Sequence, residues 1–240
     1  MKILTSEQGS DQWHIDRAGV ITASMAVVIR KKLVSGGWSM AAIKYAFRLA
    51  VERIAGMPLD DTYQTAYMSR GNRLEVDARF LHEQRIGDLI VEVGLVKSDC
   101  GNYGASADGF IGDKGGSEYK CFVEPSKLMD IWLNSDISET MDQIQMNMWL
   151  SGRERWHFGL YCPVMAKVNR ELTIIPVVRD DAYIASLVAD LEEFNELVES
   201  YKIKILENNP DSIWMPGNEI IEPMNTEYES TSVSDFIINL

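Results

Sequence analysis

The sequence predicts one domain of the α/β or α+β class, in which helices flank a central sheet. Three observations support this class. Short strand-like runs lie in the middle of the chain, between residues 89 and 179 of 240. Segments whose apolar residues recur at helical spacing lie on both sides of that region along the chain. The sequence contains no internal repeat.

The N-terminal part is predicted to be mainly helical. Residues 7–24 indicate a helix followed by a turn, and Ser24 is expected to cap the helix of "MAVVIRKKL". Ser39 is expected to cap a second helix, which Gly56 terminates. A third helix is predicted from about residue 65 to residue 85.

The rest of the chain alternates between strand and helix signals. Strands are predicted at 89–96, 103–111, 117–123, 155–164 and 171–179. Helices are predicted at 126–134 and 138–152. Between Tyr183 and Ile205 the apolar residues recur every three or four positions, which predicts one long amphipathic helix.

Charge is unevenly distributed along the chain. The net charge is −13, yet residues 1–53 carry 8 basic and 4 acidic side chains. A basic N-terminal surface can therefore hold phosphates although the whole protein is acidic. Residues 207–240 carry 7 acidic and no basic side chains. We accordingly expect one domain over 1–206, followed by an acidic tail that docks or stays loosely ordered.

The protein is expected to act in a reducing cytoplasm. Its three cysteines, Cys100, Cys121 and Cys162, are far apart in the sequence and show no metal-type pairing. The N-terminal residues lack the apolar core of a signal peptide. No uninterrupted apolar run of about 18 residues predicts a membrane span.

The segment "SADGFIGDKGGSEYKC" predicts a hairpin that carries two carboxylates and a lysine. If residues 113–115 form a three-residue loop with a left-handed Gly115, residue 108 pairs with residue 120. Asp108, Glu118 and Lys120 would then point to one face, because strand side chains alternate with period two. A two-residue loop would instead place Asp108 on the opposite face, unless a bulge restored it.

Neighbouring carboxylates repel each other unless a cation lies between them, and hard oxygen ligands suit Mg²⁺. The backbone carbonyl of Tyr119 would face the same ion, between the side chains of Asp108 and Glu118. Lys120 would orient or deprotonate an attacking water, or neutralise charge on a phosphate. Taken alone, however, this short pattern fits a solvated surface hairpin better, since Asp-Gly turns and alternating Glu and Lys are common.

Five blocks in the same order strengthen the catalytic interpretation: "EQGSDQWHIDRAGVITAS", "RGNRLEVDARF", "SADG", "EYKC" and "QIQMNMW". From about Glu7 to Tyr201 the sequence resembles the lambda exonuclease-type, YqaJ-like family of phage recombination nucleases in the PD-(D/E)XK superfamily. The resemblance implies a mixed sheet with helices on both sides. It also implies Mg²⁺-dependent digestion of linear duplex DNA from the 5′ end, which releases 5′-mononucleotides and leaves a 3′ single strand.

The same resemblance implies cofactors and partners. Two Mg²⁺ ions per site are expected, with Mn²⁺ able to substitute. The partners are duplex ends with a 5′-phosphate, two further copies of the chain in a ring-shaped homotrimer, and a protein that anneals single strands. The protein would be phage- or prophage-encoded and would act in the cytoplasm of the bacterial host cell.

By resemblance, Asp108 and Glu118 match the family's metal ligands, Tyr119 its backbone-carbonyl ligand and Lys120 its catalytic lysine. Two further residues match active-site positions: Glu75, in "RLEVDAR", and Gln143, the first glutamine of "DQIQ". Each has a plainer alternative. Glu75 fits a solvated helix residue paired with the arginine four positions later, and Gln143 fits an exposed helix position.

Arg17, Ser24 and Ser106 match residues that hold the 5′-phosphate, and Trp13 is a candidate for stacking near the terminal base. A guanidinium binds phosphate bidentately, and a helix N-terminus at Ser24 would favour an anion. The alternatives are a simple cap at Ser24, a surface ion pair between Arg17 and a nearby aspartate, and a core position for Trp13.

Two features have no place in this resemblance. His14, His82 and His157 lie in different segments without metal-ligand spacing, so each is expected to be a surface or packing residue. The acidic tail could contact the annealing partner, occupy the DNA channel as a phosphate mimic, or do neither. Two other functions stay open on sequence grounds: a structure-specific endonuclease of the same superfamily, and a non-catalytic protein that binds DNA ends.

Overall fold

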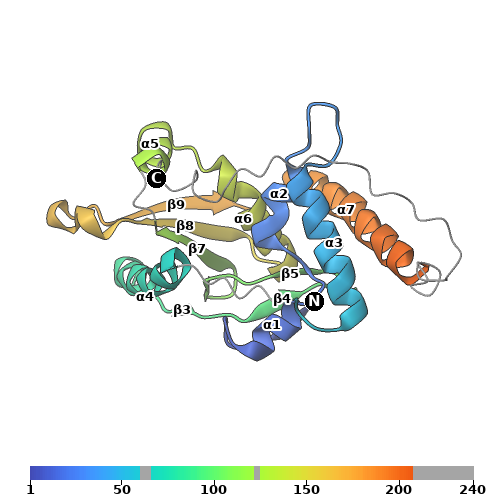
Figure 1. Cartoon of the computed structure of the whole chain (residues 1–240). Coiled ribbons are helices and arrows are strands. Elements are labelled where there is room, and N and C mark those ends of the chain that lie inside the picture. Colours follow the sequence, from blue (N-terminus) through green and yellow to red (C-terminus); the bar gives the residue numbers. More distant parts are fainter. Residues whose placement is uncertain (60–65, 122–124, 208–240) are drawn as a thin grey trace, which may run out of the picture. The chain divides into compact units, whose positions relative to one another are not determined.

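The computed structural model describes residues 1–59, 66–121 and 125–207 of the chain (Figure 1). One compact unit extends over Met1–Ile205. The acidic tail from residue 208 onward lies outside the described residues, as do the first residue of the third predicted helix and the end of the 117–123 strand. The predicted boundary near residue 206 stays a prediction.

The elements follow one another in mixed order, with helices first and most strands in the middle. The first are β1 (Lys2–Leu4), α1 (Asp11–Arg17), β2 (Ile21–Thr22), the 3₁₀ turn η1 (Ala23–Met25), α2 (Ala26–Arg30), α3 (Met40–Ala55) and α4 (Ala66–Ile86). Next come β3 (Ile90–Val91), β4 (Leu95–Lys97), β5 (Tyr103–Ala105), β6 (Gly109–Ile111), β7 (Gly115–Cys121), α5 (Pro125–Asn134) and α6 (Ser138–Ser151). The last are β8 (Arg155–Tyr161), the 3₁₀ turn η2 (Pro163–Val168), β9 (Leu172–Val178) and α7 (Asp181–Glu207).

The strands form two mixed sheets, with orders β1-β4-β5-β2 and β3-β6-β7-β8-β9. In the larger sheet β7 and β8 run parallel, and the other neighbours run antiparallel. The predicted α/β or α+β class is confirmed. The predicted mixed sheet flanked by helices is confirmed as well, and a second, smaller mixed sheet of four strands accompanies it.

Two helices cover opposite faces of the larger sheet. Phe158 and Leu160 alternate on β8 and pack in the same apolar cluster as Ile144 of α6. Tyr161, on the other face of β8, packs with Ala78 of α4. Because strand side chains alternate, the face that carries Phe158 belongs to α6 and the opposite face to α4. Figure 1 shows the sheet between these helices.

Two predicted strands are each broken where the chain passes between the sheets. The predicted strand 89–96 divides into β3 and β4, and the predicted strand 103–111 divides into β5 and β6. Residues 106–108 therefore leave the ladder of one sheet before the chain enters the other. A strand pattern alone does not reveal such a break, because the alternation of side chains continues through it.

The predicted hairpin exists, but its register differs from the expected one. Ile111 pairs with Gly115, and Gly109 pairs with Ser117. The three-residue loop is 112–114, and its left-handed residue is Gly112, with φ of 51°, instead of Gly115. The register shift is two positions, so the parity of the strands is kept. Glu118 and Lys120 therefore stay on one face of β7, as the sequence predicted, whereas Asp108 lies just before β6 and binds the edge of β7 through the Tyr119 N–H.

The predicted cap at Ser39 is confirmed, since its Oγ accepts the Ala42 N–H at 3.2 Å. The predicted cap at Ser24 is wrong. Ser24 lies inside η1, and α2 begins after Met25 without a side-chain cap. An N-cap residue has an extended backbone. The extended strand β2 ends at Thr22, and the 3₁₀ turn η1 already includes position 24, so Ser24 does not have the backbone of a cap.

The cysteines and helices agree with two sequence expectations. Cys100, Cys121 and Cys162 are all free thiols. Across the described parts of the chain, no helix combines the length and apolar character needed to span a membrane.

The hairpin strand β7 packs closely against the buried ring of Trp156, and this contact predicts the effect of a substitution on stability. A Cβ on Gly116 would lie 2.3 Å from the ring of Trp156, which is fully buried. Gly116→Ala should therefore lower the free energy of unfolding by about 1–3 kcal/mol through overpacking. Urea denaturation measures this, with Gly37→Ala as the control, because a Cβ there meets only Ser35 Oγ at 3.7 Å. Equal stability of the Gly116 variant and wild type would contradict the packing.

Candidate active site

Asp108 lies in the crossing between β5 and β6, where it is half-buried. Its Oδ2 accepts the backbone N–H of Tyr119 at 2.6 Å. Its backbone carbonyl accepts a hydrogen bond from Arg79 of α4 at 3.3 Å. Strand β7 therefore holds the carboxylate, and helix α4 holds the backbone of the same residue.

Glu118 is the buried centre of the group, with 2% of its surface exposed. Its Oε1 accepts hydrogen bonds from Lys120 Nζ at 2.8 Å and from Gln143 Nε2 at 2.6 Å. Lys120 Nζ also donates to Gln143 Oε1 at 3.1 Å. The three side chains thus form a closed triangle between β7 and α6. Glu118 Oε2 is buried and has no hydrogen-bond partner.

Glu75 approaches the group from α4. Residues 75, 79 and 82 follow the spacing of one helix face, so Glu75 shares its face with Arg79 and His82. Arg79 does not pair with Glu75, contrary to the plainer alternative. It forms an ion pair with Glu92 and donates to the Asp108 carbonyl. Likewise, Gln143 is half-buried and hydrogen-bonded, not an exposed helix position.

The carboxylates shift one another's ionisation. Burial, together with the charges of Glu118 and Glu75, raises the pKa of Asp108 well above its ordinary value. Burial and the charge of Glu118 raise the pKa of Glu75 to about 7. Burial alone would lower the pKa of Lys120, but the charges of Glu118, Asp108 and Glu75 outweigh it and raise that pKa. Three carboxyl groups around one ammonium leave the site short of positive charge.

The donor atoms fit a hard divalent cation. Glu118 Oε2 is an orphaned buried oxygen, whose desolvation is costly without a partner. Asp108 and the Tyr119 carbonyl add further oxygen donors, the type that Mg²⁺ prefers. No three His, Cys, Asp or Glu side chains within the described ranges gather closely enough to make a metal cluster by themselves. The set found here is two carboxylates and a backbone carbonyl.

A second group forms beside the first, around α1. Trp13 Nε1 donates to Ser106 Oγ at 3.1 Å. The Arg17 guanidinium lies 4.0 Å from the centroid of the Trp13 ring. Arg17 forms no ion pair or hydrogen bond with any side chain of the described residues, so the alternative pairing with a nearby aspartate is wrong. Its fork of donors is available to an anion.

Ser24 does not join this group through a hydrogen bond. It is exposed, and its Oγ lies 3.4 Å from Thr22 Oγ1. The structure therefore brings Trp13, Arg17 and Ser106 together directly. Trp13 is also a core residue, 9% exposed, so the two interpretations of this side chain are compatible.

Behind β7, His82 and His157 form a hydrogen-bonded pair that the sequence did not predict. His82 Nδ1 lies 2.7 Å from the Tyr119 hydroxyl, and His82 Nε2 lies 2.9 Å from His157 Nδ1. His82 is fully buried, as expected of a packing residue. The available signal was spacing: His82 shares a helix face with Glu75, and Tyr119 points away from Glu118 on the same strand. The network anchors β7 from its far side.

Comparison with known proteins gives a consistent picture. Residues 12–154 match the family model described as the YqaJ-like viral recombinase domain, a range that includes every candidate site residue. The fold is similar to that of an alkaline exonuclease, LHK-Exo from Laribacter hongkongensis. The TM-score is 0.73 at 26% sequence identity, over 85% of this chain and 100% of that one. The structure of LHK-Exo with dAMP gives a TM-score of 0.74 at the same identity and coverage.

A phage-related exonuclease from Haemophilus somnus shares the fold at a TM-score of 0.60. The identity is 14%, over 78% of this chain and 95% of that one. At this identity the likeness concerns the fold alone. A search of curated protein sequences gave no significant match.

The buried histidine predicts a pH dependence of stability. Burial and His157 lower the pKa of His82 from 6.5 to about 4, so the folded state favours the neutral ring. The stability that the protein has when His82 is neutral is fully present above about pH 6.5 and is lost as the pH falls toward 4, because the unfolded chain then takes up the proton more readily. His82→Gln removes the titrating group, so its free energy of unfolding should decline less steeply over this range than that of wild type.

Urea denaturation at a series of pH values measures the two slopes. His14→Gln is the matched control, because His14 is exposed and lies outside the network. It should keep the wild-type slope. Parallel curves for His82→Gln and wild type would rule out His82 as the titrating group.

Proposed function

The chain belongs to the YqaJ-like viral recombinase family, and on that premise we propose that it is a divalent-metal-dependent exodeoxyribonuclease. It would digest linear duplex DNA from the 5′ end to 5′-mononucleotides and leave a 3′ single strand for phage-type recombination. The observation that carries this proposal is the buried Glu118 with Lys120, Gln143 and an unpartnered Oε2. The exonuclease name of a relative with 26% identity, and its complex with a mononucleotide, support it.

Asp108, Glu118 and the Tyr119 carbonyl are the residues that would hold Mg²⁺, or Mn²⁺ in its place. Family resemblance favours two ions. When bound, the metal supplies an activated water and stabilises charge on the phosphodiester. Glu75 adds a third carboxylate at the side of α4, which increases the negative charge that a cation would balance.

The position of the Lys120 ammonium indicates which roles this residue takes in the reaction. Its ammonium is fixed by hydrogen bonds to Glu118 and Gln143. A donor held in this way can orient the attacking water and neutralise negative charge on the phosphate, and we assign Lys120 these two of the three roles considered from the sequence.

The Arg17 group would recognise the 5′-phosphate of the strand being digested. The Arg17 guanidinium lies over the Trp13 ring and has no acceptor among the described side chains. The Ser106 hydroxyl accepts a hydrogen bond from the same Trp13 ring, so both groups lie around one side chain. Ser106 lies two residues before Asp108, a distance of at most about 7 Å along the chain. A phosphate bound by the first group would therefore place the next phosphodiester near the second. This spacing would account for a mononucleotide product. Ser24 would contribute only from the exposed turn η1.

Family resemblance supports the remaining parts of the proposal. The chain would assemble as a ring-shaped homotrimer around DNA and act with a single-strand annealing protein. It would be phage- or prophage-encoded and work in the cytoplasm of the bacterial host.

One assay tests the whole proposal. The protein is incubated with linear duplex DNA that carries or lacks a 5′-phosphate, and with closed circular DNA, in Mg²⁺ or in EDTA. Release of 5′-mononucleotides from phosphorylated ends, in Mg²⁺ only, is the expected result. Cleavage of circles would point to a structure-specific endonuclease instead. Binding of ends without cleavage in any divalent metal would indicate a non-catalytic end-binding protein.

Lys120→Ala should keep DNA binding and lose cleavage. Removal of a positioned charge at the reacting phosphate should lower the cleavage rate by about 10²–10⁴-fold. Fluorescence anisotropy of a labelled duplex measures binding, and gel analysis measures the rate. Lys114→Ala is the control, because Lys114 lies at the exposed tip of the same hairpin and pairs with Glu154, away from the carboxylate group. Full activity of Lys120→Ala would refute the assignment.

Arg17→Ala should remove the preference for phosphorylated ends. Loss of a charge-assisted bidentate contact should reduce the ratio of rates on 5′-phosphate and 5′-hydroxyl ends by about 10–100-fold. The rate on 5′-hydroxyl ends should stay the same. Arg17→Lys, which keeps the charge but not the fork, should lie between wild type and Arg17→Ala. An unchanged ratio in Arg17→Ala would remove this role.

A further inference from the structure

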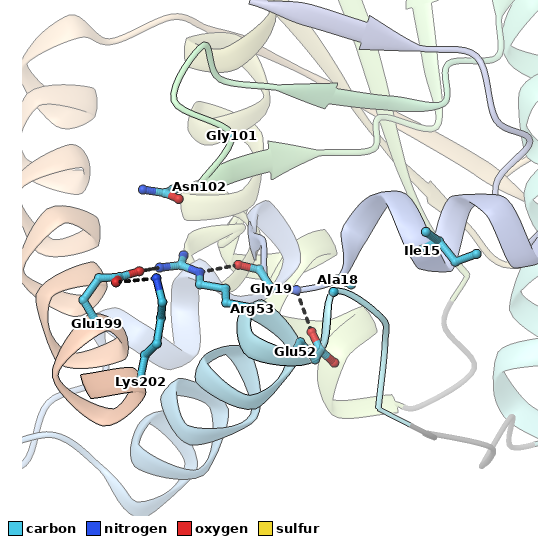
Figure 2. Close-up of a pocket in the computed structure, with 10 residues that line it drawn as sticks. Ile15, Ala18, Gly19, Glu52, Arg53, Gly101, Asn102, Glu199 and Lys202 are labelled. Carbon is cyan, nitrogen blue, oxygen red and sulfur yellow. Dashed lines mark hydrogen bonds and ion pairs between the residues drawn. The ribbon is translucent and has the colours of Figure 1, made fainter. Parts of the chain in front are cut away.

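The turn that follows α1 is held from both sides by α3. Gly19, two residues after Arg17, has a left-handed conformation with φ of 70°. Its N–H donates to Glu52 Oε2 at 2.8 Å, and its carbonyl accepts from Arg53 Nε at 2.8 Å. Both backbone groups of one residue are thus bound by two consecutive side chains of α3, as Figure 2 shows. We call this arrangement of Glu52, Arg53 and Gly19 the glycine clamp.

The clamp residues are themselves fixed. Glu52 is 4% exposed and also accepts a hydrogen bond from Arg48 Nε at 2.8 Å. Arg53 donates through Nη1 to Asn195 and Glu199 of α7, at 2.9 Å and 2.8 Å. A Cβ on Gly19 would lie 2.6 Å from Arg53 Cγ, so the arginine stem lies directly on the glycine. The turn is therefore tied through α3 to α7.

The pocket beside the clamp does not define a ligand site. Its charged lining is paired internally, since Arg53 binds Glu199 and Lys202 donates to Glu199 at 3.0 Å (Figure 2). Arg53 Nη2 is buried without a partner, which by itself identifies no ligand. The pocket marks the junction of α1, α3 and α7, and the bonds across it are structural.

Arg17 depends on this junction for its position. α1 has only seven residues, too few to be stable as an isolated helix. At its C-terminal end, Arg17 has the Trp13 ring but no ion pair or hydrogen bond among the described side chains. Trp13 is tethered to Ser106 on one side, and the clamp holds the backbone on the other. An anion site with one preformed guanidinium needs such support, because small displacements weaken oriented contacts strongly.

We propose that Glu52 and Arg53 are positioning residues for the 5′-phosphate site: they set end specificity through the Gly19 turn without contacting DNA. The proposal rests on the proposed function, in which Arg17 binds the 5′-phosphate. It separates two properties of the enzyme. Chemistry depends on Glu118 and Lys120, whereas the preference for phosphorylated ends depends on the clamp.

Three variants test the clamp: Arg53→Met, Glu52→Ala and Gly19→Ala. Each should lower the ratio of rates on 5′-phosphate and 5′-hydroxyl ends by about 10-fold. The loss should appear as a higher KM for phosphorylated ends, with kcat and the rate on 5′-hydroxyl ends nearly unchanged. Gly19→Ala attacks the turn from the other side, because a side chain is strained at that φ and meets Arg53. Glu52→Gln, which keeps an acceptor for the Gly19 N–H, should retain most of the preference.

Lys202→Ala is the matched control. It breaks an ion pair in the same pocket but does not touch Gly19, so it should keep the wild-type ratio. The rate of backbone amide hydrogen exchange in residues 13–22, measured by mass spectrometry, reports whether the clamp holds the turn and does not depend on catalysis. Exchange there should be faster in the three clamp variants than in Lys202→Ala.

The two readouts distinguish the possible failures. Faster exchange with an unchanged rate ratio would overturn the positioning role. Unchanged exchange in all three variants would overturn the clamp itself. A wild-type enzyme without preference for phosphorylated ends would refute the proposed role of Arg17, and with it the role of the clamp in specificity. Faster exchange together with a reduced ratio and an unchanged rate on 5′-hydroxyl ends would establish the proposal.

Discussion

The buried carboxylate of Glu118 is the constraint on which the arrangement of the site depends. A carboxylate removed from water needs compensating partners, and here one oxygen has Lys120 and Gln143 while the other has none. Replacing such a group with apolar side chains often leaves a protein as stable or more so, so stability does not explain its presence. The open oxygen and the surplus of negative charge make sense if the site receives a cation.

Three elements converge on this carboxylate, each for a physical reason. Strand β7 carries Glu118 and Lys120 on one face by simple alternation. Helix α6 lies on that face and supplies Gln143. Helix α4 lies on the opposite face, where His82 binds the Tyr119 hydroxyl, and extends Glu75 and Arg79 toward the edge occupied by Asp108. Strand β7 is therefore fixed from both sides, as the precise placement of functional side chains requires.

The crossing between the two sheets connects the Trp13–Arg17 group to the carboxylate group. Because residues 106–108 belong to neither ladder, their polar groups are available for other contacts. Ser106 contacts the Trp13–Arg17 group, and Asp108 turns toward Tyr119. The glycine clamp stabilises the first of these groups from a different direction. Under the proposed function, end recognition and hydrolysis would thus be tuned separately although they lie on one short stretch of chain.

The sequence by itself determined the class of the fold, most helices and strands, and the chemical types gathered in the site. Local periodicity encodes these properties, and the face shared by Glu118 and Lys120 was predicted even with the wrong register, since a shift of two keeps the parity. Only the tertiary structure decided which elements meet. It divided the predicted strand 103–111 between two sheets. It also brought together residues tens of positions apart, as in the contact of His82 with Tyr119 and of α3 with Gly19. A local pattern shows which face of an element is buried, but it does not specify the partner, because that choice depends on packing across the whole domain.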